Sequence, residues 1–110
     1  MSVDCLFCRL QRGDIPARIL YEDHGIVAFH DIAPQAPVHF LVIPRAHVTG
    51  VADATPAVVA GLVEVAVGLA RDQGLPGYRL VINQGEQGGQ SVGHLHVHVL
   101  GGRQLGWPPG

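Results

Sequence analysis

The chain has 110 residues, of which 47% are hydrophobic and 15% are charged, a composition typical of a globular domain and not of a disordered chain. The net charge of −2, with the histidines neutral, provides no basic surface for duplex nucleic acid. The sequence contains no pattern typical of a secretion signal, and its longest apolar run, residues 57–70, is interrupted by Gly61, Glu64 and Gly68. We therefore expect a single cytoplasmic domain over residues 1–110, with neither nucleic acid nor a membrane as partner.

The first half of the chain predicts a short helix and three strands. The helix covers residues 5–11 and stops near Gly13, and strands follow over residues 18–21 and 26–30, joined by a turn at residues 23–25. Residues 31–37 contain two prolines within four residues, which is unfavourable for both helix and sheet, so a loop is expected. The run VHFLVI, residues 38–43, predicts a strand that Pro44 ends.

The second half predicts one long helix and two further strands. Thr55 followed by Pro56 is a typical helix start, and apolar residues at positions 58, 59, 62, 65, 66 and 69 form one face until the helix ends near Gly74. Strands are expected over residues 78–83 and 94–100, separated by a glycine-rich loop, and residues 101–110 form an extended tail. The order predicts an α+β fold, a five-stranded antiparallel sheet with one long helix and a short N-terminal helix.

Three histidines alternate with aliphatic residues in the last predicted strand. Because side chains on a strand alternate between its two faces, His94, His96 and His98 are expected on one face and the aliphatic residues on the other. One alternative is a solvated face that uses histidine by chance, but such positions usually carry Lys, Glu, Thr or Ser. The pattern therefore favours a functional site, either a metal centre or a catalytic group.

The surroundings of this strand favour phosphate chemistry. His39, on the strand over residues 38–43, can reach the same site, and Asn83 begins a loop with four glycines in eleven residues. Gln90 and Ser91 supply neutral hydrogen-bond donors just before the histidines. Residues 87–98 contain no carboxylate, which suits a substrate that is itself negatively charged.

A second motif, Cys5-x-x-Cys8, lies in the predicted N-terminal helix. Two thiolates supply half of a tetrahedral zinc site, for which two histidines would be the other half. A redox pair and two buried free thiols are the alternatives, whereas a structural disulfide is not expected in the cytoplasm.

The segment His94-Leu95-His96-Val97-His98-Val99-Leu100 fits the signature of the histidine triad (HIT) superfamily, in which three histidines alternate with apolar residues. The resemblance covers almost the whole chain and includes residues 29–37, 39–44 and 88–91. The ending GGRQLGWPPG, residues 101–110, resembles the Hint branch of this superfamily. The resemblance implies a HIT-like fold and a homodimer whose two sheets join into one, with the long helix at or near the interface.

The resemblance also implies the chemistry. His96 would be the nucleophile that attacks the α-phosphorus of a purine nucleoside 5′-phosphoramidate, oriented by the main-chain carbonyl of His94, and water would then cleave the nucleotidyl-histidine. His98 would bind the phosphate oxygens and His39 would support the cluster. No metal cofactor would be needed for this chemistry.

Further residues are assigned to substrate binding by the same resemblance. Those expected to bind the phosphate or the leaving group are Asn83, Gln90 and Ser91. Asp31 would bind the ribose hydroxyls, Phe29 and Ile32 would line a slot for the base, and Trp107 would lie near the active site of the partner subunit. A structural zinc ion would be held by Cys5, Cys8, His47 and His94.

Several alternatives to these assignments remain open at the level of sequence. The enzyme could instead hydrolyse dinucleoside polyphosphates, use zinc bound to His94 and His96 for catalysis, or be a non-catalytic nucleotide-binding scaffold. Asp31 could be only a turn former and Asn83 only a strand-ending cap, while the apolar slot residues could belong to the core. No motif supports a functional role for His24 or His30, and both are interpreted as ordinary residues.

Overall fold

The structure, a computed structural model, describes residues 5–110, so the first four residues of the expected domain lie outside the described part. Its helices and strands are α1 (Leu6–Gln11), β1 (Ile19–Glu22), β2 (Ile26–His30), β3 (Val38–Pro44), α2 (Pro56–Asp72), β4 (Tyr78–Val81) and β5 (Val97–Gly101). Short 3₁₀ turns lie at Val51–Asp53 and Glu86–Gly88. The α+β prediction is confirmed, with its five-stranded antiparallel sheet, one long helix and one short N-terminal helix. No helix within residues 5–110 is long and apolar enough to cross a membrane.

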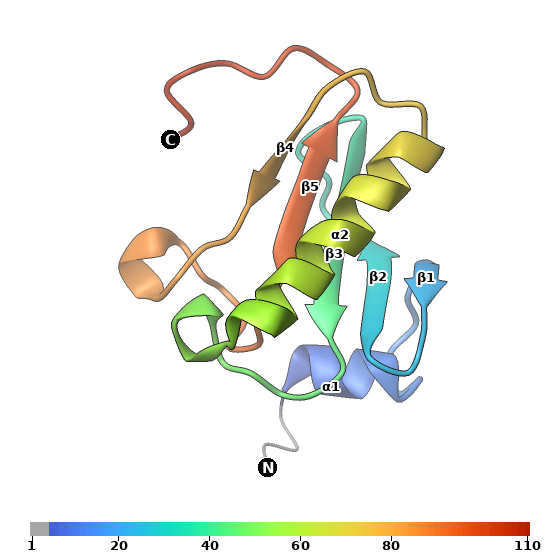
Figure 1. Ribbon diagram of the computed structural model, residues 1–110, viewed down its shortest axis with the longest axis vertical. Helices are drawn as coiled ribbons and strands as arrows, with labels where there is room; N and C mark the ends of the chain where they lie inside the picture. Colours follow the sequence, from blue (N-terminus) through green and yellow to red (C-terminus); the bar gives the residue numbers. More distant parts are fainter. Residues whose placement is uncertain (1–4) are drawn as a thin grey trace.

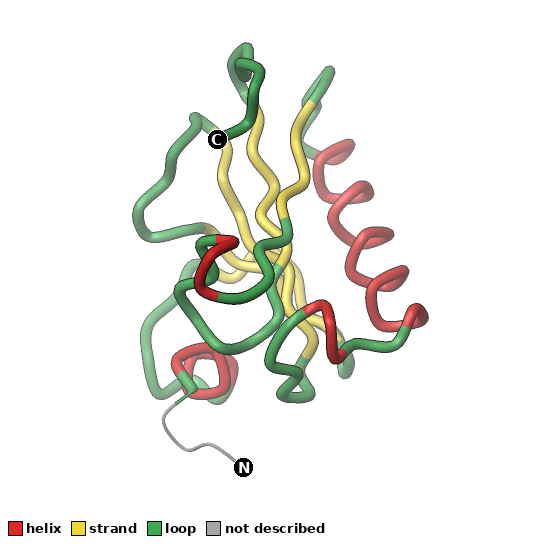
Figure 2. The backbone as a smooth tube through the Cα atoms, turned by 90° about the vertical axis from the view of Figure 1, so that its left-hand side faces the viewer, coloured by secondary structure: helices red, strands yellow, loops and turns green. Residues whose placement is uncertain are grey.

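The sheet separates two unequal layers. Its strand order is β1-β2-β3-β5-β4, and every neighbouring pair is antiparallel. Helix α2 lies diagonally across one face of the sheet, whereas α1 lies at the lower end of the other side (Figure 1). Figure 2 shows the sheet edge-on, with α2 on one side and α1 and most of the long loops on the other.

Alternation along the strands divides the core into two parts. Phe40, Val42, Val97 and Val99 belong to the cluster that packs against α2, which contributes the fully buried Leu62 and other residues. The neighbouring positions in sequence point to the opposite face. There the strands contribute Val27, Phe29, Leu41 and Ile43 to a second cluster, together with residues of the α1 segment. The histidines share this second face.

Local chemistry at both ends defines α2. The Thr55 side chain accepts a hydrogen bond from the Val58 amide at 3.3 Å, and Pro56 occupies the first turn, as predicted. The helix ends before Gly74, whose φ of +71° lies in the left-handed region that glycine adopts readily. The predicted apolar face packs on the sheet, except that Val59 is half-exposed and lies outside that cluster.

The strand predicted over residues 78–83 extends too far at its C-terminal end, and the strand predicted over residues 94–100 starts too early. Regular pairing in β4 stops at Val81, and β5 begins only at Val97, so His94 and His96 precede the strand. The physical reason lies partly in Pro44, which ends β3 and has no amide hydrogen to continue the ladder. The Leu95 amide bonds instead to the carbonyl of Val48 at 2.6 Å.

Leu62→Ala tests the packing of α2 on the sheet. Because Leu62 is fully buried, its truncation leaves a cavity, and we expect a loss of about 2–5 kcal/mol in the free energy of unfolding. Urea denaturation measures this loss. The matched control is Glu64→Ala on the exposed side of the same helix, which should stay within about 0.5 kcal/mol of the parent. Equal losses in the two variants would contradict the packing described.

Candidate active site and metal centre

The three alternating histidines are all brought to the α1 side of the sheet. His94 and His96 are buried and His98 is half-buried. The ring centroids of His96 and His98 are 5.0 Å apart, and the ring of Phe7 contacts both His94 and His96, with centroid distances of 5.9 and 5.1 Å. The expectation that the three side chains share one face therefore holds even though the first two precede the regular strand.

A main-chain carbonyl sets the protonation of His96. Its Nδ1 lies 2.7 Å from the carbonyl oxygen of His94. Because a carbonyl can only accept, the hydrogen of a neutral His96 imidazole resides on Nδ1 and the lone pair on Nε2. The contact implied by the resemblance is thus present, and Nε2 is the free nitrogen of His96.

A second chain of contacts sets the protonation of His98. The main-chain amide of Gln35 donates to Nδ1 of His39 at 3.0 Å, so the hydrogen of a neutral His39 resides on Nε2. That Nε2 lies 2.9 Å from Nδ1 of His98 and donates to it. His98 is left with its own hydrogen on Nε2, as a hydrogen-bond donor. The Gln35 amide in the proline-rich loop thereby determines, through His39, that Nε2 of His98 is a hydrogen-bond donor.

Asp31 lies beside this chain at the start of the proline-rich loop. One carboxylate oxygen accepts from the Ala33 amide at 2.8 Å, and the other is 3.5 Å from Nε2 of His39. Asp31, His39 and His98 together could be taken for a metal site because their ligand atoms cluster. The hydrogen on Nε2 of His39 argues against this, since that nitrogen has no lone pair to offer a metal.

Burial favours the neutral forms of His98 and His39. Burial, together with the neighbouring His96 and His39, lowers the pKa of His98 to about 4. Burial also lowers the pKa of His39, although the nearby Asp31 carboxylate raises it in opposition. At neutral pH His39 and His98 are therefore uncharged, as the tautomers described for these two residues require.

A cavity of about 740 Å³ opens in front of His96 and His98. The predicted site residues that line it are Phe29, Asp31, Ile32, Ser91, His96 and His98. Its walls are largely apolar, and Ile32 is fully exposed at its edge. A cavity of this size, apolar with a few convergent polar groups, can accept a nucleotide-sized molecule.

Sequence reasoning missed part of the lining. The additional residues are Leu6, Phe7, Leu10, Ile15, Pro16, Ala17, Arg18, His30, Pro34, Leu41 and Val92. Leu6 and Leu10 are four residues apart on a predicted helix, a spacing that places them on one side and could have indicated a wall. His30 had been taken as ordinary, and nothing in its sequence context indicates the cavity.

Two predicted phosphate-binding residues, Asn83 and Gln90, lie outside the lining of the cavity. The Gln90 side chain accepts from the Gly85 amide at 2.8 Å and donates to the carbonyls of Thr49 and Val92, so it ties the glycine-rich loop together. Asn83 lies against Gly88 and Gly89 of the same loop. Neither residue lines the cavity within this chain.

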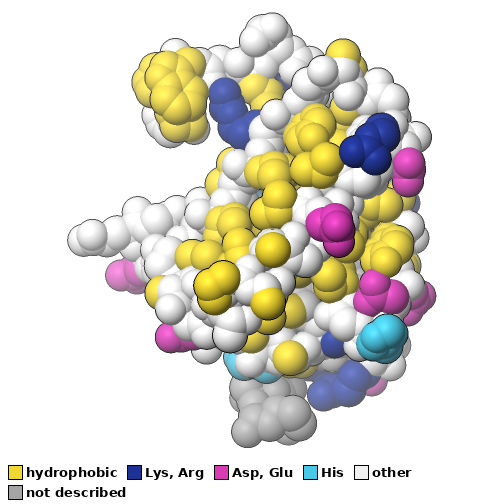
Figure 3. Space-filling model, in the orientation of Figure 1, with side chains coloured by type: hydrophobic (Ala, Val, Ile, Leu, Met, Phe, Trp, Pro, Cys, Tyr) yellow, Lys and Arg dark blue, Asp and Glu magenta, His cyan; other side chains and the backbone are white. Residues whose placement is uncertain are grey.

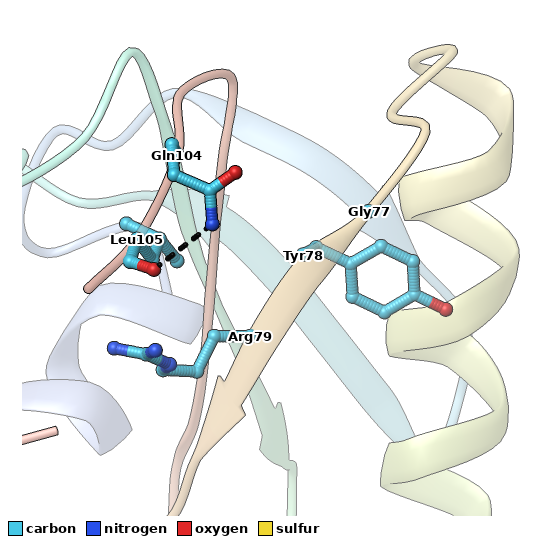
Figure 4. A pocket seen from close by; sticks show the side chains of 5 residues that line it. All are labelled: Gly77, Tyr78, Arg79, Gln104 and Leu105. Atoms are coloured by element: carbon cyan, nitrogen blue, oxygen red, sulfur yellow. Dashed lines mark hydrogen bonds between the residues drawn. The ribbon is translucent and has the colours of Figure 1, made fainter. Parts of the chain in front are cut away.

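The tail also lies away from the cavity. Trp107 is 82% exposed and its ring lies 5.9 Å from the Arg79 guanidinium, which donates to the Gly106 carbonyl at 2.6 Å. Figure 4 shows Arg79 extending from β4 towards the tail, whereas Tyr78 points towards α2. Within one chain the tail therefore lies near Arg79 of the outer strand β4 and away from the histidines.

The four predicted zinc ligands are brought together. Nδ1 of His94 lies 3.3 Å from the sulfur of Cys5 and 3.6 Å from that of Cys8, and Nδ1 of His47 lies 3.3 Å from the sulfur of Cys8. The other nitrogen of His94, Nε2, donates to the Pro44 carbonyl at 2.8 Å, which leaves a lone pair on Nδ1 facing the sulfurs.

This donor set fits zinc. Ordinary zinc–sulfur and zinc–nitrogen bonds at tetrahedral angles separate sulfur from nitrogen by about 3.6 Å, close to the distances found. Both cysteines belong to the α1 segment. Cys8 lies in the helix, and Cys5 is its N-cap, whose sulfur accepts a hydrogen bond from the Cys8 amide at 3.3 Å. Burial raises the pKa of the Cys8 thiol, which disfavours the alternative of a reactive redox pair.

The low pKa of His98 predicts an acid-sensitive fold. In the unfolded chain a histidine titrates near 6.5, and in the folded protein this one titrates near 4, so only the unfolded chain binds the proton between these values. We expect the free energy of unfolding contributed by this group to fall as the pH is lowered from 6.5 to 4. An NMR titration of the His98 ring should give a midpoint near 4, and a midpoint near 6.5 would contradict the burial described.

Comparison with known proteins agrees with this geometry. The HIT domain family model matches residues 12–105. An uncharacterized HIT-like protein of Synechococcus elongatus is 50% identical over the full length of both chains, and a 14 kDa zinc-binding protein of Zea mays is 47% identical, covering 96% of this chain and 87% of the maize protein. The crystal structure of a HIT family hydrolase from Legionella pneumophila superposes with a TM-score of 0.94 at 47% identity, covering 97% of this chain and all of that one. The chain therefore belongs to the HIT domain family.

Proposed function

We propose that this protein is a hydrolase of the Hint type that cleaves purine nucleoside 5′-phosphoramidates through a nucleotidyl-histidine at His96. The observation that carries the proposal is the His96 imidazole, whose Nδ1 is bound to the His94 carbonyl and whose ring lines the large cavity. The similar Legionella protein, described as a hydrolase, and the tail sequence at residues 101–110 support it.

The proposed reaction has two steps that conserve atoms and charge. The lone pair of His96 Nε2 attacks the α-phosphorus, the bond from phosphorus to the leaving nitrogen breaks, and that nitrogen departs as an amine after taking up one proton. Water then attacks the same phosphorus, the bond to Nε2 breaks, and the proton lost by water balances the one taken up. His94 holds the ring throughout, because its carbonyl continues to accept from Nδ1.

The other site residues have distinct proposed roles. The Nε2 hydrogen of His98 donates to the phosphate oxygens, where negative charge accumulates during both attacks. Asp31 accepts hydrogen bonds from the ribose hydroxyls, and Ser91, at the cavity lining, donates towards the leaving group. The apolar wall that includes Phe29 and Ile32 covers the base.

Zinc has no proposed part in bond breaking. When bound at the four ligands described above, it would supply a structural cross-link between the α1 segment and the sheet. His96, the proposed nucleophile, lies outside that ligand set. Metal removal should therefore leave part of the turnover at saturating substrate, and loss of all turnover with the metal would support a zinc enzyme instead.

His96→Asn tests the proposed nucleophile. Asparagine cannot form the covalent intermediate, so we expect hydrolysis of adenosine 5′-phosphoramidate to fall by on the order of 10³-fold or more while AMP binding is largely kept. Mass spectrometry of the parent enzyme quenched during turnover should show an adenylyl group on His96. Full turnover in the variant would refute the mechanism and leave a scaffold function as the better account.

We also propose that the protein is a homodimer formed along β4. Within residues 5–110, strand β4 pairs only with β5, so its other edge is open in this part of the chain. Half-exposed Val59, Val63 and Val67 recur every fourth residue on α2, and Figure 3 shows hydrophobic side chains gathered over this helix. Joining two such edges would produce one continuous sheet and bring the tail of each chain, with Trp107, towards its partner.

Sedimentation tests the dimer. We expect a stable dimer at micromolar concentration, and Val63→Glu should weaken it because a charge would be buried in an apolar contact. Glu64→Gln on the same helix is the control and should leave the dimer intact. A parent protein that sediments as a monomer would refute the proposed interface and the placement of Trp107 near a partner's site.

A further inference from the structure

His94 belongs to two sites at once. Its side chain lies in the Cys5, Cys8 and His47 cluster, while its main-chain carbonyl accepts from Nδ1 of His96. Its imidazole is also held by the Pro44 carbonyl, so both ring nitrogens and the carbonyl of this residue are engaged. A ligand that fixes the His94 ring therefore also fixes the acceptor that orients His96.

Phe7 provides a second connection between the same two sites. It lies on α1 between the two cysteines, is only 5% exposed, and lines the cavity. Its ring is nearly perpendicular to that of His96, with an interplanar angle of 86° and centroids 5.1 Å apart, and it also packs edge-wise on Phe29 at 5.4 Å. It thus contacts the predicted nucleophile and one residue of the proposed base slot.

Helix α1 depends on its attachments to hold Phe7 in this place. A six-residue helix is too short to be stable alone in water. Apart from its apolar packing and the contacts of Cys8 with histidines, α1 has one side-chain hydrogen bond to the rest of the described residues. It runs from Gln11 to the Arg45 carbonyl at 2.7 Å and lies at the far end from Cys5. At the end nearer Phe7, the attachment consists of the two cysteines and their histidine partners.

From these contacts we infer that a metal ion in the Cys5, Cys8, His47 and His94 cluster positions His96 for nucleotide binding and attack, through the carbonyl of His94 and the ring of Phe7. Phe7 is a positioning residue in this scheme, since it acts through His96. The metal centre then has a second role besides stability: metal loss releases one wall of the cavity and the support of the nucleophile together. The effect on nucleotide affinity rests on the proposed function, whereas the effect on the His96 ring does not.

The first experiment compares zinc-loaded and chelated protein. The readouts are the NMR signal of the His96 Nδ1 hydrogen, which its short bond to the His94 carbonyl should protect from exchange, and the AMP dissociation constant by calorimetry. Far-UV circular dichroism monitors folding. We expect the chelated protein to remain folded, because the cluster beneath α2 contains neither cysteine, but to lose the protected signal and to bind AMP about two- to tenfold more weakly, the size of an aromatic contact.

The second experiment keeps the metal and changes Phe7. Phe7→Leu retains an apolar side chain and all four ligands, so zinc content should remain one per chain. We expect the His96 hydrogen to exchange faster and AMP binding to weaken by about two- to tenfold. Arg9→Gln, an exposed change on the same helix with no side-chain hydrogen bond, should alter neither readout. This experiment keeps the inference testable if the chelated protein unfolds.

The outcomes separate the two proposals. If zinc-loaded parent protein fails to bind AMP, the proposed function fails, and the inference is judged by the His96 signal alone. If chelation and Phe7→Leu leave both the signal and AMP affinity unchanged, the inference is overturned even though the enzyme is active. A drop in melting temperature without any change at His96 would likewise overturn it, because it would show a purely structural role.

Discussion

The antiparallel pairing of β3 with β5 is the constraint on which the site depends. Phe40 lies opposite Val99 and Val42 opposite Val97, and all four are held against α2 in the larger core. Because side chains alternate, burying these residues on one face sends His39 and His98 to the other, where their positions in the register are diagonal and their rings meet. A shift of the register by one residue would turn the histidines into the core and expose the valines.

Main-chain groups give the histidines different chemical roles. The His94 carbonyl holds the hydrogen of His96 on Nδ1, the Pro44 carbonyl leaves the lone pair of His94 facing the cysteines, and the Gln35 amide acts on His98 through His39. Peptide groups do not titrate. The nitrogen that carries the hydrogen in each ring therefore stays the same over the whole pH range in which the imidazoles are neutral. One residue type thereby supplies an electron pair, a candidate metal ligand and a hydrogen-bond donor within a single cluster.

Much of the fold and part of the site follow from local patterns. The period of two in residues 94–100, the Thr55-Pro56 helix start and the apolar spacing of α2 are properties of neighbouring residues, and the structure realises them. The Cys5-x-x-Cys8 spacing similarly indicates half a metal site. The ends of β4 and β5 depend on where a partner strand stops, and the hydrogen bonds of the Gln90 amide depend on how the loop around it folds, so neither follows from a local pattern.

The sequence by itself determined that three imidazoles share a face, that the fold is α+β with a sheet that carries them, and that two cysteines near the N-terminus form half of a candidate metal site. Only the tertiary structure decided which partners each imidazole has. The sulfur of Cys5 contacts the ring of His94, 89 residues away, the ring of Phe7 on α1 contacts that of His96, and the Gln35 amide donates to His39. Periodicity describes the direction of a side chain along its own element, whereas a contact between distant segments depends on how the packed core places whole elements, which no local pattern specifies.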